Sequence, residues 1–250
     1  MSQSKVRRES GFFLIEGKRA VEQVLSQHEN DVDELLCTEE MVVEYENHSV
    51  CARIISSQKM SSICSSRTPQ GIAAVVRIPP QVYSSQLPLN VGNAVLLLEH
   101  VQDPGNVGSL IRSAAALGYC GCILSANCAD PFSPKVVQST AGSVLSVWIR
   151  RTDDYLKCVS QLRKSGYQLI SADLGGSENV DFTGLSKHVL ALGSEGSGLT
   201  RGVLCSSDRV FRIPILEKAV ESLNVAASGA ICMFMCSGRL QLNPGTVRQG

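Results

Sequence analysis

The sequence predicts an α/β fold in which a small N-terminal α/β region precedes a larger α/β region built on a mostly parallel sheet. From about residue 91 short apolar strands alternate with helices, and such alternation produces a sheet covered by helices on both faces. The composition changes near residue 80, because three prolines and two serines lie between residues 79 and 90. The 250 residues are enough to bury one large core or two smaller ones.

In the N-terminal region, apolar residues recur at helical spacing and predict a helix within residues 16–27, at Ala20, Val21, Val24 and Leu25. Further expected elements are a strand at 31–38, a second helix at 41–48, and a turn followed by a strand over 66–79. Because residues 79–90 have the composition of a linker, we expect an N-terminal domain over 1–80, a linker over 81–90 and a second domain over 91–250.

The second region reads as strand, loop and helix repeated several times. The predicted strands are 93–100, 121–124, 167–173, 188–193 and 209–214, and the predicted helices are 109–118, 153–166 and 222–236. Glycines at 118 and 166 end the first two of these helices.

The charge balance excludes some classes of protein. Lys and Arg number 23 and Asp and Glu also number 23, which argues against a histone-like binder that holds polyanions by bulk charge. A basic cluster at the front of the chain (Lys5, Arg7, Arg8, Lys18 and Arg19) could still contact a polyanion locally. No apolar run is long enough to span a bilayer, and the first residues do not have the pattern of a secretory signal, so a cytoplasmic protein is expected.

Ten cysteines are present, but their spacing contains no metal or redox motif. No CxxC occurs and no histidine lies beside a cysteine pair, so we expect buried thiols in a reducing compartment and no metal, with zinc as the remote alternative.

The first motif with chemical content is QDPGNVGSLIRSAAALG (102–118), a loop that leaves a strand and enters a helix. Ligands of open α/β sheets gather outside the carboxyl ends of strands, where this loop is expected. Asn106 can donate and accept hydrogen bonds, and Arg112 offers five donors in a fixed fork. The alternative is that Asn106 caps a helix and Arg112 is a solvated charge, although its neighbours Leu110 and Ile111 are apolar.

The second motif is HVLALGSEGSGLT (188–200), in which an apolar strand enters a loop with glycines at 193, 196 and 198 and with Glu195 between them. Such glycines let the backbone approach a ligand closely. The spacing differs from the dinucleotide fingerprint, and a carboxylate there would repel a pyrophosphate. Glu195 could instead orient a cation, a hydroxyl or an arginine.

The third motif lies within RVFRIPILEKAVESLNVAASGAI (209–231). Ser222 is expected to open a helix, with Asn224 in its first turn, and the alternative reading is an ordinary serine N-cap. The small residues from Ala226 to Ala230 form a face suited to close packing against another helix or backbone.

Together and in this order, the three motifs resemble those of the SpoU (TrmH) family of RNA ribose 2′-O-methyltransferases of the SPOUT superfamily. The N-x-G-x-x-x-R pattern falls on Asn106, Gly108 and Arg112, LGSEGSGL on 192–199, and IP…SLNVA on 213–226. The front of the chain (FLIEGKRAVEQVL, DVDELLCTEE and TPQGIAAV) resembles the N-terminal RNA substrate-binding domain of many members, which is similar to kink-turn-binding ribosomal proteins.

This resemblance implies a methyltransferase domain with a C-terminal trefoil knot, which binds S-adenosylmethionine and works as a homodimer. Carried over by position, the cofactor-binding residues are Gly193, Ile213 and Leu223, and the catalytic set is Asn106, Arg112, Glu195, Ser222 and Asn224. Because an arginine is a poor general base, we expect Arg112 to clamp a phosphate and stabilise the developing alkoxide, with Glu195 orienting it. One departure is visible: family members usually have a glycine soon after the Ile-Pro pair, whereas residues 215–221 have none and are one residue longer.

The expected reaction is methyl transfer to a ribose 2′-hydroxyl, with ribosomal RNA as the expected substrate and tRNA as the alternative. Two other classes stay open at this point. A nicotinamide or flavin enzyme would use the same glycine loop, and a catalytically silent RNA-binding protein could retain the scaffold.

Overall fold

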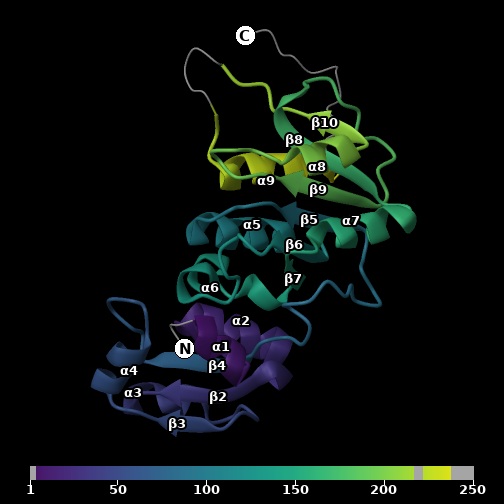
Figure 1. Cartoon of the computed structure of the whole chain (residues 1–250). Coiled ribbons are helices and arrows are strands. Elements are labelled where there is room, and N and C mark those ends of the chain that lie inside the picture. The colour runs from purple at the N-terminus through teal and green to yellow at the C-terminus, as the bar shows by residue number, and fades with distance from the viewer. Residues whose placement is uncertain (1–3, 217–221, 238–250) are drawn as a thin grey trace.

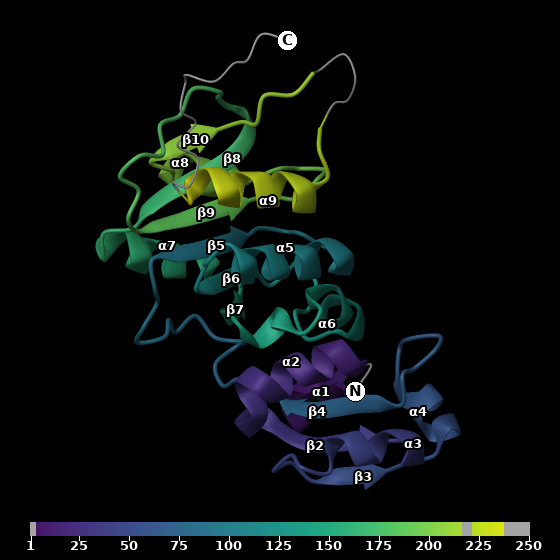
Figure 2. The ribbon, with the colours of Figure 1, turned by 180° about the vertical axis from the view of Figure 1, so that it is seen from behind.

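The computed structural model describes residues 4–216 and 222–237, and these residues form two sheets at opposite ends of an elongated molecule (Figure 1). The N-terminal sheet has the order β1-β4-β2-β3, and the C-terminal sheet has the order β10-β8-β9-β5-β6-β7. The view from behind shows the segment between the two sheets running along the second one (Figure 2).

In the C-terminal sheet, the described strands all pair in parallel. The strands are β5 (Ala94–Leu98), β6 (Gly121–Ser125), β7 (Trp148–Thr152), β8 (Gln168–Ser177), β9 (His188–Leu192) and β10 (Arg209–Phe211). The helices are α5 (Pro104–Ala116), α6 (Pro134–Thr140), η3 (Ser143–Leu145), α7 (Tyr155–Lys164), α8 (Arg201–Ser206) and α9 (Val225–Cys236). This confirms the predicted parallel α/β architecture.

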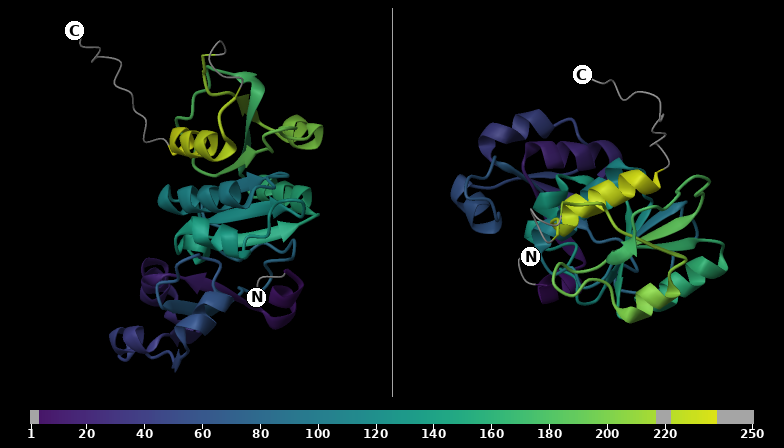
Figure 3. Two further views of the ribbon diagram at one scale, coloured as in Figure 1. Left: turned by 90° about the vertical axis from the view of Figure 1, so that its left-hand side faces the viewer. Right: turned by 90° about the horizontal axis from the view of Figure 1, so that it is seen from above.

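Helices cover both faces of this sheet because its central strands are apolar on both sides. Along β5, Leu96 and Leu98 belong to the core under α5 and α9, whereas Val95 and Leu97 belong to the core under α7 and α8. Successive side chains of a strand point to opposite faces, so a continuous apolar run has to be covered twice. Figure 3 shows α5 and α9 on one side of the sheet and α8 on the other.

The N-terminal sheet is mixed: β4 pairs antiparallel with β1 and β2, and β2 pairs parallel with β3. The strands are β1 (Phe12–Glu16), β2 (Val32–Cys37), β3 (Ala52–Ile54) and β4 (Ile72–Arg77). The helices are α1 (Ser4–Ser10), α2 (Lys18–His28), η1 (Glu29–Asp31), α3 (Glu39–Val42), η2 (Val43–Tyr45) and α4 (Ser57–Ile63). The helix predicted within residues 16–27 is α2, which buries Val21, Val24 and Leu25, whereas Ala20 is half-buried.

The two parts of the chain share one continuous core. Phe13 of β1 packs against Phe132 of the second part with ring centroids 4.8 Å apart, and both rings are buried. The intervening residues 78–93 contain no helix or strand, but they contact the second part of the chain. Val82 is buried and its carbonyl accepts a hydrogen bond from Arg151 N at 2.7 Å, which covers the edge strand β7.

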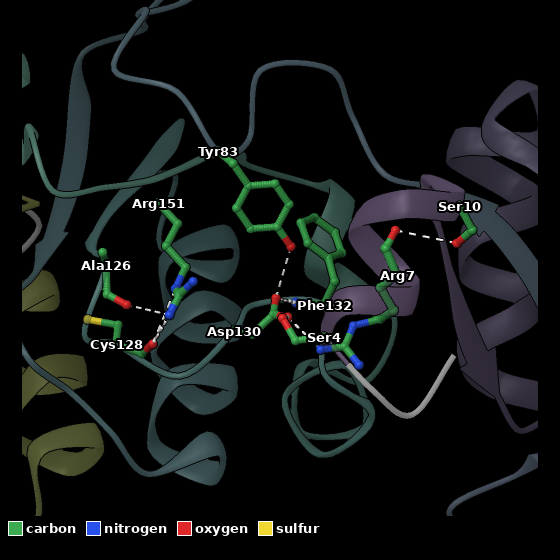
Figure 4. A network of polar contacts seen from close by, with 9 residues as sticks. All are labelled: Ser4, Arg7, Ser10, Tyr83, Ala126, Cys128, Asp130, Phe132 and Arg151. Atoms are coloured by element: carbon green, nitrogen blue, oxygen red, sulfur yellow. Dashed lines mark hydrogen bonds and ion pairs between the residues drawn. The ribbon is translucent and has the colours of Figure 1, made fainter.

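Asp130 joins three segments at this junction (Figure 4). Its carboxylate accepts hydrogen bonds from Arg7 of α1 at 2.5 Å, from Ser4 at 3.1 Å and from Tyr83 of the connecting segment at 3.2 Å. Burial opposes ionisation, but hydrogen bonds from Arg7 and from Phe132 N outweigh it and hold the pKa of Asp130 below its ordinary value. To the left of Asp130 in Figure 4, Arg151 donates hydrogen bonds to the carbonyls of Ala126 and Cys128.

These contacts correct the prediction of a basic cluster free to meet a polyanion. Arg7 is 2% exposed and paired with Asp130, and the Arg8 guanidinium lies 4.4 Å from the centre of the Tyr83 ring. Lys18 pairs with Glu44 at 2.5 Å. Of the five cations only Arg7 is buried, and a buried guanidinium requires a carboxylate or other acceptors. Lys5, Arg8, Lys18 and Arg19 remain exposed, so folding removes Arg7 from the predicted cluster and leaves the other four at the surface.

Several element boundaries also differ from the prediction. The predicted helix at 109–118 begins at Pro104 because Asp103 caps it, and the helix predicted from Ser222 begins at Val225 because Asn224 caps it. The helix predicted at 41–48 is a short α-helix followed by a 3₁₀ turn that ends at Tyr45.

All ten cysteines are free thiols, and most are buried, although Cys51 and Cys205 are exposed. Over residues 4–216 and 222–237, three or more His, Cys, Asp or Glu side chains nowhere come together as a metal site would require. Within the same residues, none of the helices has the length and apolar character needed to cross a membrane.

His188, at the start of β9, makes folding sensitive to pH. The side chain is 5% exposed, its Nε2 lies 3.0 Å from the Tyr119 hydroxyl, and burial lowers its pKa to about 4. The thiols of Cys122, Cys232 and Cys236 surround the same tyrosine. The neutral imidazole is therefore the form that fits the fold.

We predict that stability falls as the pH drops from about 6.5 to about 4, because over this range the unfolded chain binds a proton at His188 that the folded chain does not. The contribution should reach about 1.4 kcal/mol per pH unit. Urea unfolding at several pH values, on the wild type and on His188→Gln, measures it. The variant can still donate to Tyr119 but cannot titrate, so an unchanged pH slope in the variant would contradict the assignment.

Candidate active site

The three sequence motifs meet at the carboxyl edge of the parallel sheet, where β5 and β9 lie side by side. From this point β6 and β7 extend the sheet in one direction, and β8 and β10 extend it in the other. Such a switch in strand order leaves a crevice above the strand ends, which is the usual ligand site of open α/β sheets.

The first motif supplies Asn106 from the first turn of α5. Asp103 is the N-cap of this helix, since its side chain accepts a hydrogen bond from Asn106 N at 2.8 Å, and Pro104 occupies the first helical position. This Asp-Pro start favours a helix entry and fixes the direction in which Asn106 points. Asn106 therefore does not cap the helix, and its side chain remains available for the site.

Glu195 connects the other two motifs to the first. Its Oε1 accepts hydrogen bonds from Asn106 Nδ2 at 2.9 Å, from Asn224 Nδ2 at 2.8 Å and from Val225 N at 3.3 Å. Asn224 Nδ2 also donates to Asn106 Oδ1 at 3.0 Å. Residues that are 89 and 118 positions apart in sequence are thus held around a single carboxylate oxygen.

Asn224 has a second task as the N-cap of α9. Its Oδ1 accepts hydrogen bonds from Ala226 N at 2.9 Å and from Ala227 N at 3.3 Å. The helix that follows approaches α5 closely at Gly229, where an added Cβ would lie 2.3 Å from a Leu110 methyl and 2.7 Å from one of Leu192. This confirms the predicted close packing of the small-residue face and explains why Asn224 reaches Asn106.

The glycine loop after β9 folds back on itself. Ser194 and Gly198 form an isolated β-bridge, and the Ser194 hydroxyl accepts a hydrogen bond from Ser197 N at 3.2 Å. A Cβ added at Gly193 would lie 2.1 Å from the carbonyl carbon of Gly198, so any side chain at 193 would open the turn. Gly196, at the tip, faces open space.

A first cavity of about 380 Å³ lies between this loop and the C-terminal segment. Its wall includes Gly193, Glu195, Ile213, Ser222 and Leu223, which the sequence singled out. Further lining residues that the sequence did not single out are Asp173, Arg212, Ser228 and Cys232. Residues 217–221, within the unusual 215–221 stretch, lie outside the described residues.

A second cavity of about 510 Å³ adjoins the first and shares Ser194, Glu195, Gly196, Ser197 and Val225 with it. On its other side lie His100, Asp103 and Asn106, together with Asn127 from the loop after β6. The site therefore consists of two adjacent cavities, with Glu195 in the wall that they share.

A buried carboxylate holds the strand ends in place. Glu99 at the end of β5 is fully buried, and it accepts hydrogen bonds from Thr200 N at 2.6 Å, from the Thr200 hydroxyl at 2.8 Å and from the Tyr155 hydroxyl. Because these partners come from α7 and from the start of α8, Glu99 fixes the far end of the glycine loop to β5. The sequence reading missed this residue, whose signal was an acidic side chain directly after an apolar strand.

Arg112 does not join the other predicted residues in this chain. It is exposed, lines neither cavity, and makes no hydrogen bond or ion pair with any residue that the structure describes. Six positions along a helix separate it from Asn106 by about 120° of rotation, so the two side chains leave different faces of α5. Glu195 therefore does not contact Arg112 of its own chain, and the orientation of Arg112 by Glu195 stays a prediction.

Comparison with protein families agrees with this geometry. Residues 93–234 match the model of the SpoU rRNA Methylase family. The chain belongs to this family. Residues 1–74 separately match the model of an MRM3-like substrate binding domain.

Relatives of the SpoU family match over nearly the full chain. A curated relative, the 23S rRNA (guanosine(2553)-2′-O)-methyltransferase RlmP of Bacillus subtilis, is 30% identical over 236 residues, which cover 94% of this chain and 92% of RlmP. A TrmH-family RNA methyltransferase structure from Porphyromonas gingivalis has a TM-score of 0.82 at 29% identity and covers 94% of this chain and 93% of its own. An AdoMet-bound rRNA methyltransferase from Sinorhizobium meliloti has a TM-score of 0.79 at 28% identity and covers 96% and 92%.

We predict that Gly193→Ala destabilises the protein by about 1–3 kcal/mol, whereas Gly196→Ala changes its stability little. The added methyl at 193 would overlap the backbone of Gly198, but at 196 it meets no atom within 4 Å. The two variants carry the same substitution three residues apart in one loop. Urea unfolding of both compares them directly, and equal losses would contradict the tight turn.

Proposed function

We propose that this protein transfers a methyl group from S-adenosylmethionine to a ribose 2′-hydroxyl of ribosomal RNA. The supporting observation is the convergence of Asn106, Glu195 and Asn224, from the three family motifs, between two adjoining cavities. One cavity can hold the methyl donor and the other the acceptor nucleotide, so that donor and acceptor meet near Glu195. Holding two reactants at attack distance can itself supply much of the acceleration.

The first cavity fits S-adenosylmethionine. Its volume of about 380 Å³ lies within the usual range of small-molecule sites, and its wall mixes apolar Leu192, Ile213 and Leu223 with backbone and hydroxyl groups. Gly196 lines the same cavity, and no atom lies within 4 Å of the position that its Cβ would take, so a ligand can approach the backbone closely there. Bound there, the cofactor supplies an electrophilic methyl group on a sulfonium centre.

The residues of the chain would then have separate tasks. We assign Gly193, Ile213 and Leu223 to the cofactor wall, and Ser222, at the mouth of the same cavity, to the ribose. Glu195 and Asn224 set the position of Asn106, whose amide borders the second cavity and is suited to hold the acceptor nucleotide.

The N-terminal part is the proposed RNA-recognition domain, as its match to a substrate-binding domain model supports. A-form RNA is recognised largely by shape and backbone, so few basic side chains are needed. Because this part is fixed to the methyltransferase part through Asp130 and Phe132, it would present RNA at a set distance from the two cavities. The 23S rRNA activity named for RlmP favours ribosomal RNA over tRNA.

We further propose a homodimer in which Arg112 of one copy completes the site of the other. Arg112 is exposed and points away from Glu195 of its own chain, although a guanidinium is well suited to clamp an RNA phosphate. A two-fold dimer would let this face of α5 meet the partner's cavities.

The trefoil knot and a cytoplasmic location are part of the same proposal. The knot is what membership of the SpoU family implies.

The function predicts methyl transfer from labelled S-adenosylmethionine to unmodified 23S rRNA transcript. The RNA backbone at the labelled nucleotide should resist alkaline cleavage, because its 2′-hydroxyl is methylated. Total tRNA serves as the competing substrate. Label on tRNA alone would move the proposal to the alternative substrate, and label on neither RNA would contradict it.

The dimer predicts that two inactive variants restore each other. Arg112→Ala and Glu195→Ala should each lose methyl transfer as homodimers. After mixing and subunit exchange, half of the dimers contain one intact site, so about a quarter of wild-type activity should return. If Arg112 served its own chain, mixing would restore nothing. Circular dichroism of each variant controls for folding.

A further inference from the structure

His100 lines the second cavity, which we assign to the acceptor nucleotide and call the acceptor cavity. None of the three motifs gives this side chain a role. It lies two residues after the end of β5, and it lines the same cavity as Asn106, Glu195 and Asn127. The imidazole makes no hydrogen bond or ion pair with any described residue, although its backbone N–H donates to the Ser125 hydroxyl at 2.9 Å. The backbone is thus held, and both ring nitrogens are available to a ligand.

The backbone at His100 adopts a left-handed conformation, with φ of 59°. For a residue with a Cβ this conformation is strained, and it persists only where the surroundings impose it. Here the surroundings are the Ser125 hydrogen bond and the buried carboxylate of the preceding Glu99. Glycine or asparagine would relieve this cost, so the conformation does not explain a histidine at this position.

The reaction needs a group that accepts a proton, and the other residues of the site serve poorly. Arginine side chains do not give up their proton in proteins, which excludes Arg112 as the base. Oε1 of Glu195 already accepts three hydrogen bonds, and Asp103 caps α5. Histidine is the side chain that ordinarily exchanges a proton near neutral pH. Among the described residues that line the cavity, His100 is the one of this type.

We propose that His100 accepts the proton of the ribose 2′-hydroxyl during methyl transfer, an inference that rests on the proposed function. The O–H bond breaks as the oxygen forms its bond to the methyl carbon, and the methyl–sulfur bond breaks. Its electron pair stays on sulfur, so the positive sulfonium becomes a neutral thioether. The positive charge leaves as the proton on the imidazole, which then returns it to water.

His100→Asn is the main test, because asparagine tolerates the left-handed backbone and keeps a polar side chain but cannot take up a proton near neutrality. Single-turnover methyl transfer to unmodified 23S rRNA transcript should fall on the order of 10²-fold at neutral pH. The wild-type rate should decline as the pH falls, because a general base acts only in its unprotonated form, and the variant should lack this decline. The carboxylates that share the cavity, Asp103 and Glu195, are unchanged in both proteins.

His100→Gly provides a second test that a structural role would not pass. Glycine suits the backbone and leaves a space where the ring was. Added imidazole should restore part of the lost rate, more strongly at pH values where imidazole is neutral. Equal rates of wild type and His100→Asn across pH, or no rescue of His100→Gly, would overturn the proposal.

Protection from chemical modification gives a readout independent of turnover. Carbethoxylation of His100 by diethylpyrocarbonate, followed by mass spectrometry, should slow when 23S rRNA transcript and S-adenosylhomocysteine are both bound. His28 and His48, which are partly exposed, serve as internal references. Unchanged modification of His100 in the complex would contradict contact with the acceptor.

The failure of the proposed function and the failure of the role of His100 are distinguishable. If the wild type methylates neither 23S rRNA nor tRNA, the proposed function fails. If it methylates one of them but His100→Asn is unaffected, the role of His100 alone fails.

Discussion

The arrangement of the site depends on one carboxylate oxygen, Oε1 of Glu195, which collects donors from two distant segments. Asn106 lies in the first turn of α5 and Asn224 is the N-cap of α9, and each donates to Glu195 Oε1 within 3 Å. Each of these donors is fixed by its own helix start, since Asp103 caps α5 and Asn224 caps α9. Because the helix ends are defined by capping, the amide groups are preorganised around Glu195 without any ligand.

The same carboxylate stands in the wall common to both cavities. Under the proposed function, Glu195 would lie between the methyl donor and the acceptor nucleotide. Its hydrogen bonds from Asn106 and Asn224 fix the position of its side chain. Glu99 performs a related task one layer deeper, where it fixes the end of the glycine loop to β5 through Thr200. Two carboxylates at neighbouring strand ends thus determine the shape of the crevice.

The loop after β6 links this crevice to the N-terminal part. Asn127 lines the second cavity, and Arg151 donates to the carbonyls of the residues before and after it, Ala126 and Cys128. Asp130, three residues further along, binds Arg7 of α1. An RNA bound by the N-terminal part would therefore lie in fixed relation to the acceptor cavity. The connecting segment adds to this rigidity, because Val82 is bound to the edge of the sheet rather than exposed.

The sequence by itself determined the parallel α/β architecture, the family and the residues of the glycine loop, because apolar periodicity and motif spacing are local properties that survive folding. It also indicated Asn106, Glu195 and Asn224, but not that they bind one another, since pairing over 89 and 118 residues depends on which strands become neighbours. Only the tertiary structure showed that Arg112 leaves α5 on another face, that Arg7 is buried and paired with Asp130, and that His100 lines the second cavity. The physical reason is the same in each case. The sequence gives the chemical type of each side chain, whereas the packing of distant segments determines its direction and its partners.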